Sequence, residues 1–155
     1  MCGFLTDPHR RCRCSSTQVQ RYLAKVSGPL LDRIDLHIDV PAVPFDALSN
    51  APAGEPSATI RTRVRRAIAF RRTRGQHQPN ARLRAKDLKT VCALAPPALA
   101  LLKSAMQELN LSARSYTKVL KISRTVADLA GSDEILPDHI AEAIQYRSLD
   151  RQWWG

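Results

Sequence analysis

The chain contains a single run of residues with the alternation of a β-strand, and this run limits the possible folds more than any other feature. Residues 34–40 are IDLHIDV, in which apolar and polar side chains alternate before Pro41 ends the pattern. A lone strand has no neighbour in its own chain to satisfy its backbone hydrogen bonds. We therefore expect one short strand that needs partners from elsewhere, and we interpret the chain as a fragment of a larger protein.

Helical patterns follow Thr59. Apolar residues recur at helical spacing in the first of these segments (Ile60, Val64, Ala67 and Ile68), and Gly75 is a typical stop signal. Further helices are predicted over residues 85–93, from Pro96 to Asn110, from an N-cap at Ser112 to Gly131, and from about Pro137; a short helical pattern covers residues 18–26. The expected fold class is mainly α: a bundle of about five helices, preceded by an irregular segment with one short strand.

The predicted core faces follow from the same spacing. The helix that begins at Pro96 should bury Leu99, Leu102, Met106 and Leu109, and the helix after Ser112 should bury Tyr116, Val119, Leu120, Ser123, Val126, Ala127 and Ala130. Residues 46–58, rich in Ala, Pro, Ser and Gly, are predicted to be a linker. This organisation gives a first part at residues 1–45, expected to be poorly ordered alone, and a helical domain at residues 59–151.

Positive charge is concentrated in one segment. The formal net charge is +10, which favours an anionic partner such as nucleic acid or a nucleotide phosphate. Residues 61–74 hold seven arginines and no acid. Either these side chains contact a DNA backbone or they form a solvated face, and charge alone does not decide between the two. The candidate nucleic-acid contacts are Arg61, Arg65, Arg66, Arg71 and Arg72. Base stacking is not supported, because only Phe70 lies among them.

Several classes of function are disfavoured. No stretch approaches the roughly 18 apolar residues of a membrane span, and residues 1–14 lack the apolar region of a signal peptide, so a cytoplasmic protein without a membrane partner is expected. No G-x-x-x-x-G-K-[ST] phosphate loop occurs in the sequence. We therefore expect this chain alone to be inactive as a nucleotide hydrolase.

Two arginines occupy positions that call for an explanation. Arg33 lies between Asp32 and Asp35, where an exposed ion pair would contribute only about 0–1 kcal/mol. Arg114 falls in the first turn of the helix after Ser112, where a cation opposes the helix dipole. That placement makes sense if Arg114 projects towards a phosphate; the alternative is a solvated arginine on a basic protein.

Three of the four cysteines crowd the first fourteen residues. Cys2, Cys12 and Cys14 form a cluster of the kind that binds a metal or stays reduced, while Cys92 is predicted to be a small core residue. His9 lies within the same segment and offers a fourth ligand, so that the four side chains would suit a tetrahedral zinc ion. The alternative is a disordered, reduced tail.

Two long segments carry a specific resemblance. CGFLTDPHRRCRCSSTQVQRYLAKVSGPLLDRIDLHIDVP and LSARSYTKVLKISRTVADLAGSDEILPDHIAEAIQYRSLDR resemble the C-terminal part of the magnesium-chelatase-like AAA+ ATPases, most of all the ComM (YifB) competence group. The resemblance covers residues 2–45 and 60–151. It implies a ring-forming homo-oligomer, a hexamer, that uses ATP and Mg²⁺ and acts on DNA in recombination or natural transformation, as a branch-migration helicase does. Residues 1–45 would end the ATPase core, and residues 60–151 would be its helical lid.

The resemblance also implies roles for the residues above. Arg33, in LLDRID, matches the arginine finger that is presented to the γ-phosphate bound by a neighbouring subunit. Arg114, in SARSY, matches the sensor-2 arginine, which contacts nucleotide in its own subunit. The cysteines resemble a four-thiolate pattern, CPCG followed by C-x-C, whose first member has no counterpart here.

Two other functions stay open. Leu101 to Ala130 can be drawn as a helix-turn-helix with its turn at residues 110–112, in which Arg114, Ser115 and Lys118 would contact bases. A chelatase subunit that inserts magnesium into a porphyrin is the third hypothesis, and the cysteine pattern and the IQYRSLDR tail resemble it less.

Overall fold

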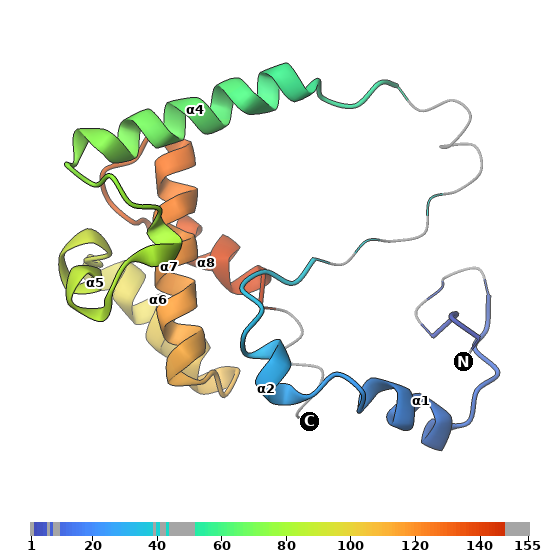
Figure 1. Ribbon diagram of the computed structural model, residues 1–155. Coiled ribbons are helices and arrows are strands. Elements are labelled where there is room, and N and C mark those ends of the chain that lie inside the picture. The colour runs from blue at the N-terminus through green and yellow to red at the C-terminus, as the bar shows by residue number, and fades with distance from the viewer. Residues whose placement is uncertain are drawn as a thin grey trace. The chain divides into compact units, whose positions relative to one another are not determined.

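The computed structural model (Figure 1) describes residues 2–5, 7, 10–38, 40, 43 and 52–147. The chain divides into two compact units, Met1–Ala53 and Gly54–Gly155. Each unit is described by itself below. Within the described residues no helix is long and apolar enough to cross a bilayer.

The first unit contains two helices. Helix α1 spans Ser16–Leu23, and its first turn is closed by a capping box in which Ser15 and Gln18 bond each other's backbone N–H groups. Helix α2 is a single turn, Gly28–Leu31, with Pro29 in its first turn. The strand expected over residues 34–40 is not formed, since residues 34–38 and 40 have no strand structure and Asp39 lies outside the described residues. The physical reason is that the described residues offer it no partner strand.

The second unit is the helical bundle that the sequence predicts, and the mainly α fold class is confirmed. Its elements are α4 (Ser57–Thr73), the 3₁₀ turn η1 (Asn80–Arg82), α5 (Ala85–Val91), α6 (Pro96–Glu108), α7 (Ala113–Ala130) and α8 (Pro137–Gln145). Two helices begin where their sequence signals predict: Pro96 is the first residue of α6, and Ser112 caps α7. Gly131 ends α7 in the left-handed conformation, with φ of 70°.

Helix α7 lies at the centre of this unit and contacts α4, η1, α5 and α8, while α8 also packs on α6 (Figure 1). The core is built from apolar residues of these elements and the loops between them: Leu83, Leu88, Cys92, Ala98, Leu102, Ala105, Val119, Leu120, Ala127, Ile135, Ile140, Ala143 and Ile144. A parallel β-bridge between Leu94 and Ile135 ties the α5–α6 loop to the α7–α8 loop.

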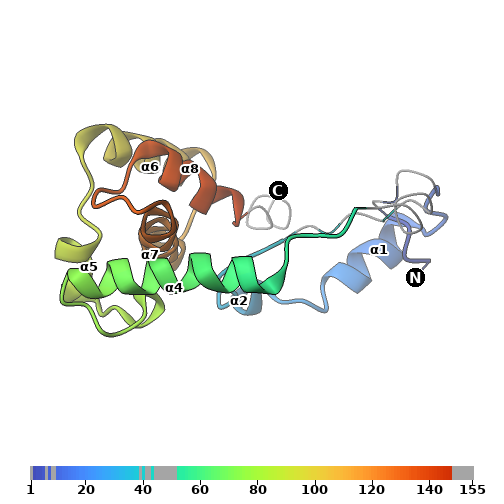
Figure 2. The same ribbon diagram turned by 90° about the horizontal axis from the view of Figure 1, so that it is seen from above.

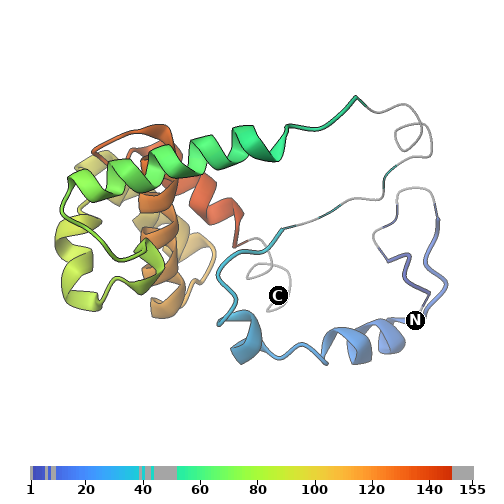
Figure 3. The same ribbon diagram turned by 45° about the horizontal axis from the view of Figure 1, so that its top comes forward.

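Some residues predicted to be buried are exposed. Leu99 retains 50% of its accessible surface, and Tyr116 and Ala130 are also exposed. In α4, Ile60 and Val64 are 41% and 43% exposed because the first half of the helix extends beyond the bundle (Figure 3). Helical spacing identifies an apolar face, but it does not tell whether a neighbouring helix covers that face.

Candidate functional site

Arg114 lies at the entrance of the longest helix in the bundle. It is the second residue of α7, and its side chain is exposed. The Ser112 side chain accepts a hydrogen bond of 3.1 Å from the backbone N–H of Ser115, which fixes the first turn around Arg114. The first N–H groups of a helix and the helix dipole favour an anion. A guanidinium in this position can contact the same anion that the helix end attracts.

Arg33 is an exposed residue of the first unit, just after α2. Its Nη1 donates a hydrogen bond of 3.1 Å to the Pro29 carbonyl oxygen. This hydrogen bond joins Arg33 to the backbone of the preceding turn. The exposed guanidinium has the planar fork of donors that matches phosphate oxygens, so Arg33 is suited to a phosphate.

A buried ion cluster joins α7 to the end of α4. Asp128 is 4% exposed, and it accepts bonds of 2.7 and 3.1 Å from the Arg74 guanidinium and one of 3.1 Å from Nε of Arg124. Arg124 is 2% exposed and also donates to the carbonyl oxygens of Ser132 and Asp133. Burial lowers the pKa of Arg124, whereas the Asp128 carboxylate raises it. Because each buried charge is paired and hydrogen-bonded, the cluster fixes the α7–α8 loop and the end of α4.

The same carboxylate also orders the loop before α5. Asn80 donates 2.8 Å to Asp128 and 3.1 Å to the Thr125 hydroxyl, and Gln76 donates 2.7 Å to the Asn80 side-chain oxygen. These contacts bind residues 74–83 to one side of α7. The sequence did not reveal them, since predictions of the α7 core face considered apolar and small residues only. The sequence does contain a signal for this ion pair, because Arg124 and Asp128 are four residues apart in the helix and lie beside the predicted core positions.

Ser115 points into the bundle rather than out of it. Its side chain is buried, and Arg147 at the end of α8, also buried, donates a bond of 3.3 Å to the Ser115 hydroxyl. Ser115 therefore cannot reach a base edge. The helix-turn-helix hypothesis loses one of its three base-contacting side chains, while Arg147 ties the last helix to the turn that carries Arg114.

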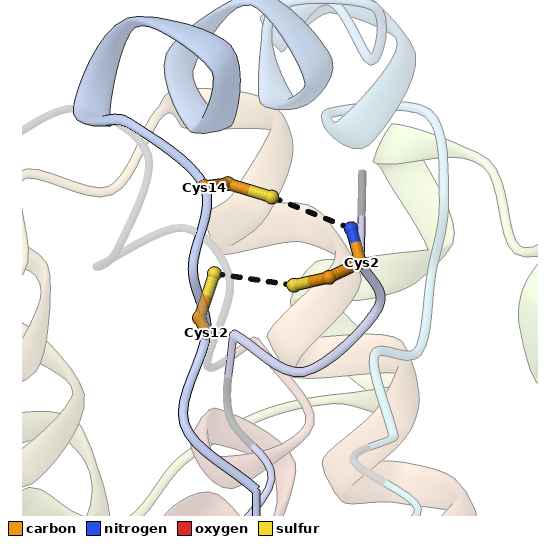
Figure 4. A group of neighbouring side chains, drawn as sticks. All are labelled: Cys2, Cys12 and Cys14. Carbon is orange, nitrogen blue, oxygen red and sulfur yellow. Dashed lines mark hydrogen bonds between the residues drawn. The ribbon is translucent and has the colours of Figure 1, made fainter.

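The three N-terminal cysteines come together (Figure 4). Their sulfur atoms all lie within 4.8 Å of one another, with Cys2 and Cys12 Sγ at 3.4 Å, and the Cys2 backbone N–H donates 3.3 Å to Cys14 Sγ. Hydrogen bonds from the backbone of Phe4 and then of Arg13 lower the pKa of Cys2 to about 6. His9, the fourth predicted ligand, lies outside the described residues.

This cysteine cluster fits three corners of a zinc site. Zn–S bonds of about 2.3 Å in a tetrahedron place sulfur atoms about 3.8 Å apart. The Cys2–Cys12 sulfur separation is 3.4 Å and no pair of the three sulfur atoms is more than 4.8 Å apart, so the cluster brackets that value. The side chains that would hold a zinc ion are Cys2, Cys12 and Cys14, and the ion would join residues 2–5 to the segment before α1.

The comparisons with known proteins follow the division into two units. The family model for the C-terminal part of magnesium chelatase subunit ChlI matches residues 54–147. This chain belongs to the magnesium-chelatase-like family. A second model of the family, for subunit ChlI itself, matches residues 1–48.

The relatives within this magnesium-chelatase-like family include a competence protein. The chain is 40% identical to competence protein ComM of Haemophilus influenzae over 96% of its own length and 29% of the relative. It is also 40% identical to an uncharacterised protein, YifB, of Salmonella typhimurium, over 90% of this chain and 28% of the relative. An uncharacterised protein of Mycobacterium tuberculosis is 33% identical over 91% of this chain and 28% of the relative. The chain thus spans less than a third of the length of these curated relatives.

The arginines of α4 have different environments in this family member. Arg63 pairs with Glu55 at 2.8 Å, Arg74 belongs to the buried ion cluster, and the half-buried Arg71 donates 3.3 Å to the His77 carbonyl oxygen. The remaining four are exposed and have no acidic partner among the residues that the structure describes: Arg61, Arg65, Arg66 and Arg72. Arg71, a predicted nucleic-acid contact, is thus placed apart from the other four candidates.

Proposed function

We propose that this chain supplies two arginines to the nucleotide site of a ring-forming AAA+ ATPase that acts on DNA in recombination or natural transformation, with branch migration as its activity. The observation that carries the proposal is the family match over residues 54–147, together with the similarity to a competence protein. The relatives are more than three times as long as the matched region, so the ATP- and Mg²⁺-binding parts would come from outside this chain.

Arg33 would act as the arginine finger. Transfer of a phosphoryl group spreads negative charge over three equatorial oxygens, and a guanidinium from a neighbouring subunit stabilises that charge. The exposure of Arg33 supports this role, because a finger must leave its own subunit to reach the partner's nucleotide. Arg114, at the first turn of α7, would contact nucleotide bound to its own subunit and pass the change to the lid through α7.

The test uses the full-length protein and ATP turnover. Arg33→Ala should lower kcat by about 10³-fold or more while leaving nucleotide affinity nearly intact, since arginine fingers contribute about 10³–10⁵ to the rate. Arg114→Ala should weaken both turnover and nucleotide binding. Arg21 is an exposed arginine on α1 of the same unit, so Arg21→Ala is the matched control. It should keep the turnover and the nucleotide affinity of the unmodified full-length protein. Normal turnover in the Arg33 variant would refute the finger assignment.

A mixing experiment tests whether the finger acts between subunits. Arg33→Ala subunits, which keep an intact nucleotide site, are mixed with subunits whose phosphate loop is inactivated but whose Arg33 is intact. If the arginine serves its neighbour, the mixture regains turnover that neither variant has alone. A mixture as inactive as its components contradicts a role in trans.

We also propose that Cys2, Cys12 and Cys14 bind zinc in a structural role. The sulfur separations support it, as does the thiolate-stabilising hydrogen bond from the Cys2 N–H to Cys14. Titration with Co²⁺ should give a thiolate-to-cobalt absorption band that Cys12→Ser abolishes and excess Zn²⁺ removes. The buried Cys92 supplies the control, because Cys92→Ser should keep the band. A band that survives Cys12→Ser would show that these thiolates are not the ligands.

A further inference from the structure

Three exposed arginines of α4 form a ridge along one side of the helix. With about 100° of rotation per residue, Arg61, Arg65 and Arg72 project within about 40° of one another, and about 16 Å of helix separates the first from the last. Arg66 lies about 120° away from them around the axis. Helix α4 lies alongside α7 (Figure 2). Ala67, Arg71 and Arg74 share one side of the helix and are half-buried, and Arg74 bonds to Asp128 of α7, so the ridge is on the outer side of α4. We call Arg61, Arg65 and Arg72 the arginine ridge.

Within the part of the chain that the structure describes, no acid neutralises the arginine ridge. None of the three side chains has an acidic partner among the described residues, whereas Arg63 and Arg74 of the same helix each have one. Arg61 and Arg65 are four residues apart, a like-charge spacing that destabilises a helix by a few tenths of a kcal/mol. A row of positive charges without acidic partners does not stabilise the fold, but it suits an extended anion.

The side chains around the arginine ridge indicate which anion fits. Ala58, Thr62 and Ala69 border it on the side away from α7, and all three are exposed, so small side chains leave room for a backbone to approach. No exposed aromatic residue accompanies the arginines, because Phe70 is half-buried with the Arg74 guanidinium 5.9 Å from its ring centre. A site for single strands usually offers aromatic stacking surfaces, and a protein interface usually offers an apolar centre. The arginine ridge itself has neither, since the large exposed aliphatic residues of α4, Ile60 and Val64, lie about 60° or more away from it around the helix axis.

We infer that the arginine ridge of α4 binds the phosphate backbone of duplex DNA, without reading its sequence. This inference deepens the DNA part of the proposed function and rests on it. Arginine suits the task because its planar donor fork matches phosphate oxygens, and three such contacts would hold the duplex along α4. Arg66 and Arg71 are left out of the contact, the first by its direction and the second by its burial.

The test measures DNA binding by this chain at several salt concentrations, with a labelled duplex and no nucleotide. Each phosphate contact contributes about 0.9 to the slope of log K against log salt for B-DNA. Replacement of all three ridge residues (R61Q, R65Q and R72Q) should therefore reduce the slope by about 2.7, which shrinks the affinity change between 50 and 200 mM salt by about 40-fold. Because nucleotide is absent, the result does not depend on the Arg33 and Arg114 assignments.

Two control variants separate position from total charge and from folding. Arg82→Gln, Lys86→Gln and Lys89→Gln together remove the same charge from exposed positions at η1 and α5, and should leave the slope nearly unchanged. Replacement of the ridge residues by lysine should retain the slope, since the charges stay in place. Equal losses in the ridge and control glutamine variants, or an unchanged slope in the ridge variant, would overturn the inference; the second result would leave an acidic protein as the partner of α4.

Discussion

At the scale of single residues, Asp128 is the position where substitution should cost the most stability. One carboxylate serves Arg74, Arg124 and Asn80, and each of these comes from a different part of the helical unit. A buried ion that loses its partner retains its desolvation cost without the compensating attraction, which makes removal of one member costly. The charge at Asp128 is therefore tied to the stability of the whole bundle, although no nucleotide or DNA contact is assigned to it.

Asp128→Ala should lower the free energy of unfolding by about 3–5 kcal/mol, because it leaves two arginines without their carboxylate. Urea denaturation followed by circular dichroism measures the change. The exposed Glu134 supplies a matched acid, and Glu134→Ala should stay within about 0.5 kcal/mol of the parent. A similar, small loss in both variants would mean that the ion cluster contributes little to stability.

Cys92 gives the unit a dependence on alkaline pH. Burial raises the pKa of this thiol from 9.0 to about 11. Below pH 9 the thiol is neutral in both states, but between pH 9 and 11 it ionises in the unfolded chain first, so the free energy of unfolding falls as pH rises. The urea midpoint of the parent should decline across this window more than that of Cys92→Ala. Parallel declines in the two proteins would contradict the assignment.

At the scale of elements, local signals predicted the ends of helices well. Pro96, Ser112 and Gly131 act through their own backbone chemistry, which needs no knowledge of the rest of the fold. The failures are at positions that depend on distant neighbours. Leu99 and Ile60 are apolar at the right spacing but keep 50% and 41% of their surface exposed, and residues 34–38 and 40 pair with no strand among the described residues.

The candidate site divides in the same way. The sequence predicted that Arg114 lies next to its N-cap, because the two residues are close in the chain. It also predicted that the three cysteines form a cluster, because their spacing follows a known pattern. It could not separate Arg74 and Arg71 from the exposed arginines of α4, because that requires the positions of Asp128 and of the His77 carbonyl. Long-range pairing therefore decided which charges are left for a ligand.

Ser112 links the stability of α7 to the position of Arg114. Ser112→Ala removes the side-chain oxygen that accepts the Ser115 N–H, and should cost about 1 kcal/mol of unfolding free energy. Thermal unfolding measures it, with Ser104→Ala on the exposed side of α6 as the control. In the full-length protein the same change should weaken nucleotide binding, because the frayed turn carries Arg114. Unchanged stability and nucleotide affinity would show that the cap does not organise this turn.

At the scale of the whole molecule, the division into two units predicts independent folding of the second. All thirteen residues of its core cluster lie between Leu83 and Ile144, within the unit that starts at Gly54. A chain of residues 54–155 should therefore unfold cooperatively, with a melting temperature within about 4 °C of the parent, which corresponds to less than about 1 kcal/mol for a domain of this size. Calorimetry of the two chains makes the comparison. A broad transition, or a larger drop in melting temperature, would mean that residues 1–53 contribute to the stability of the bundle.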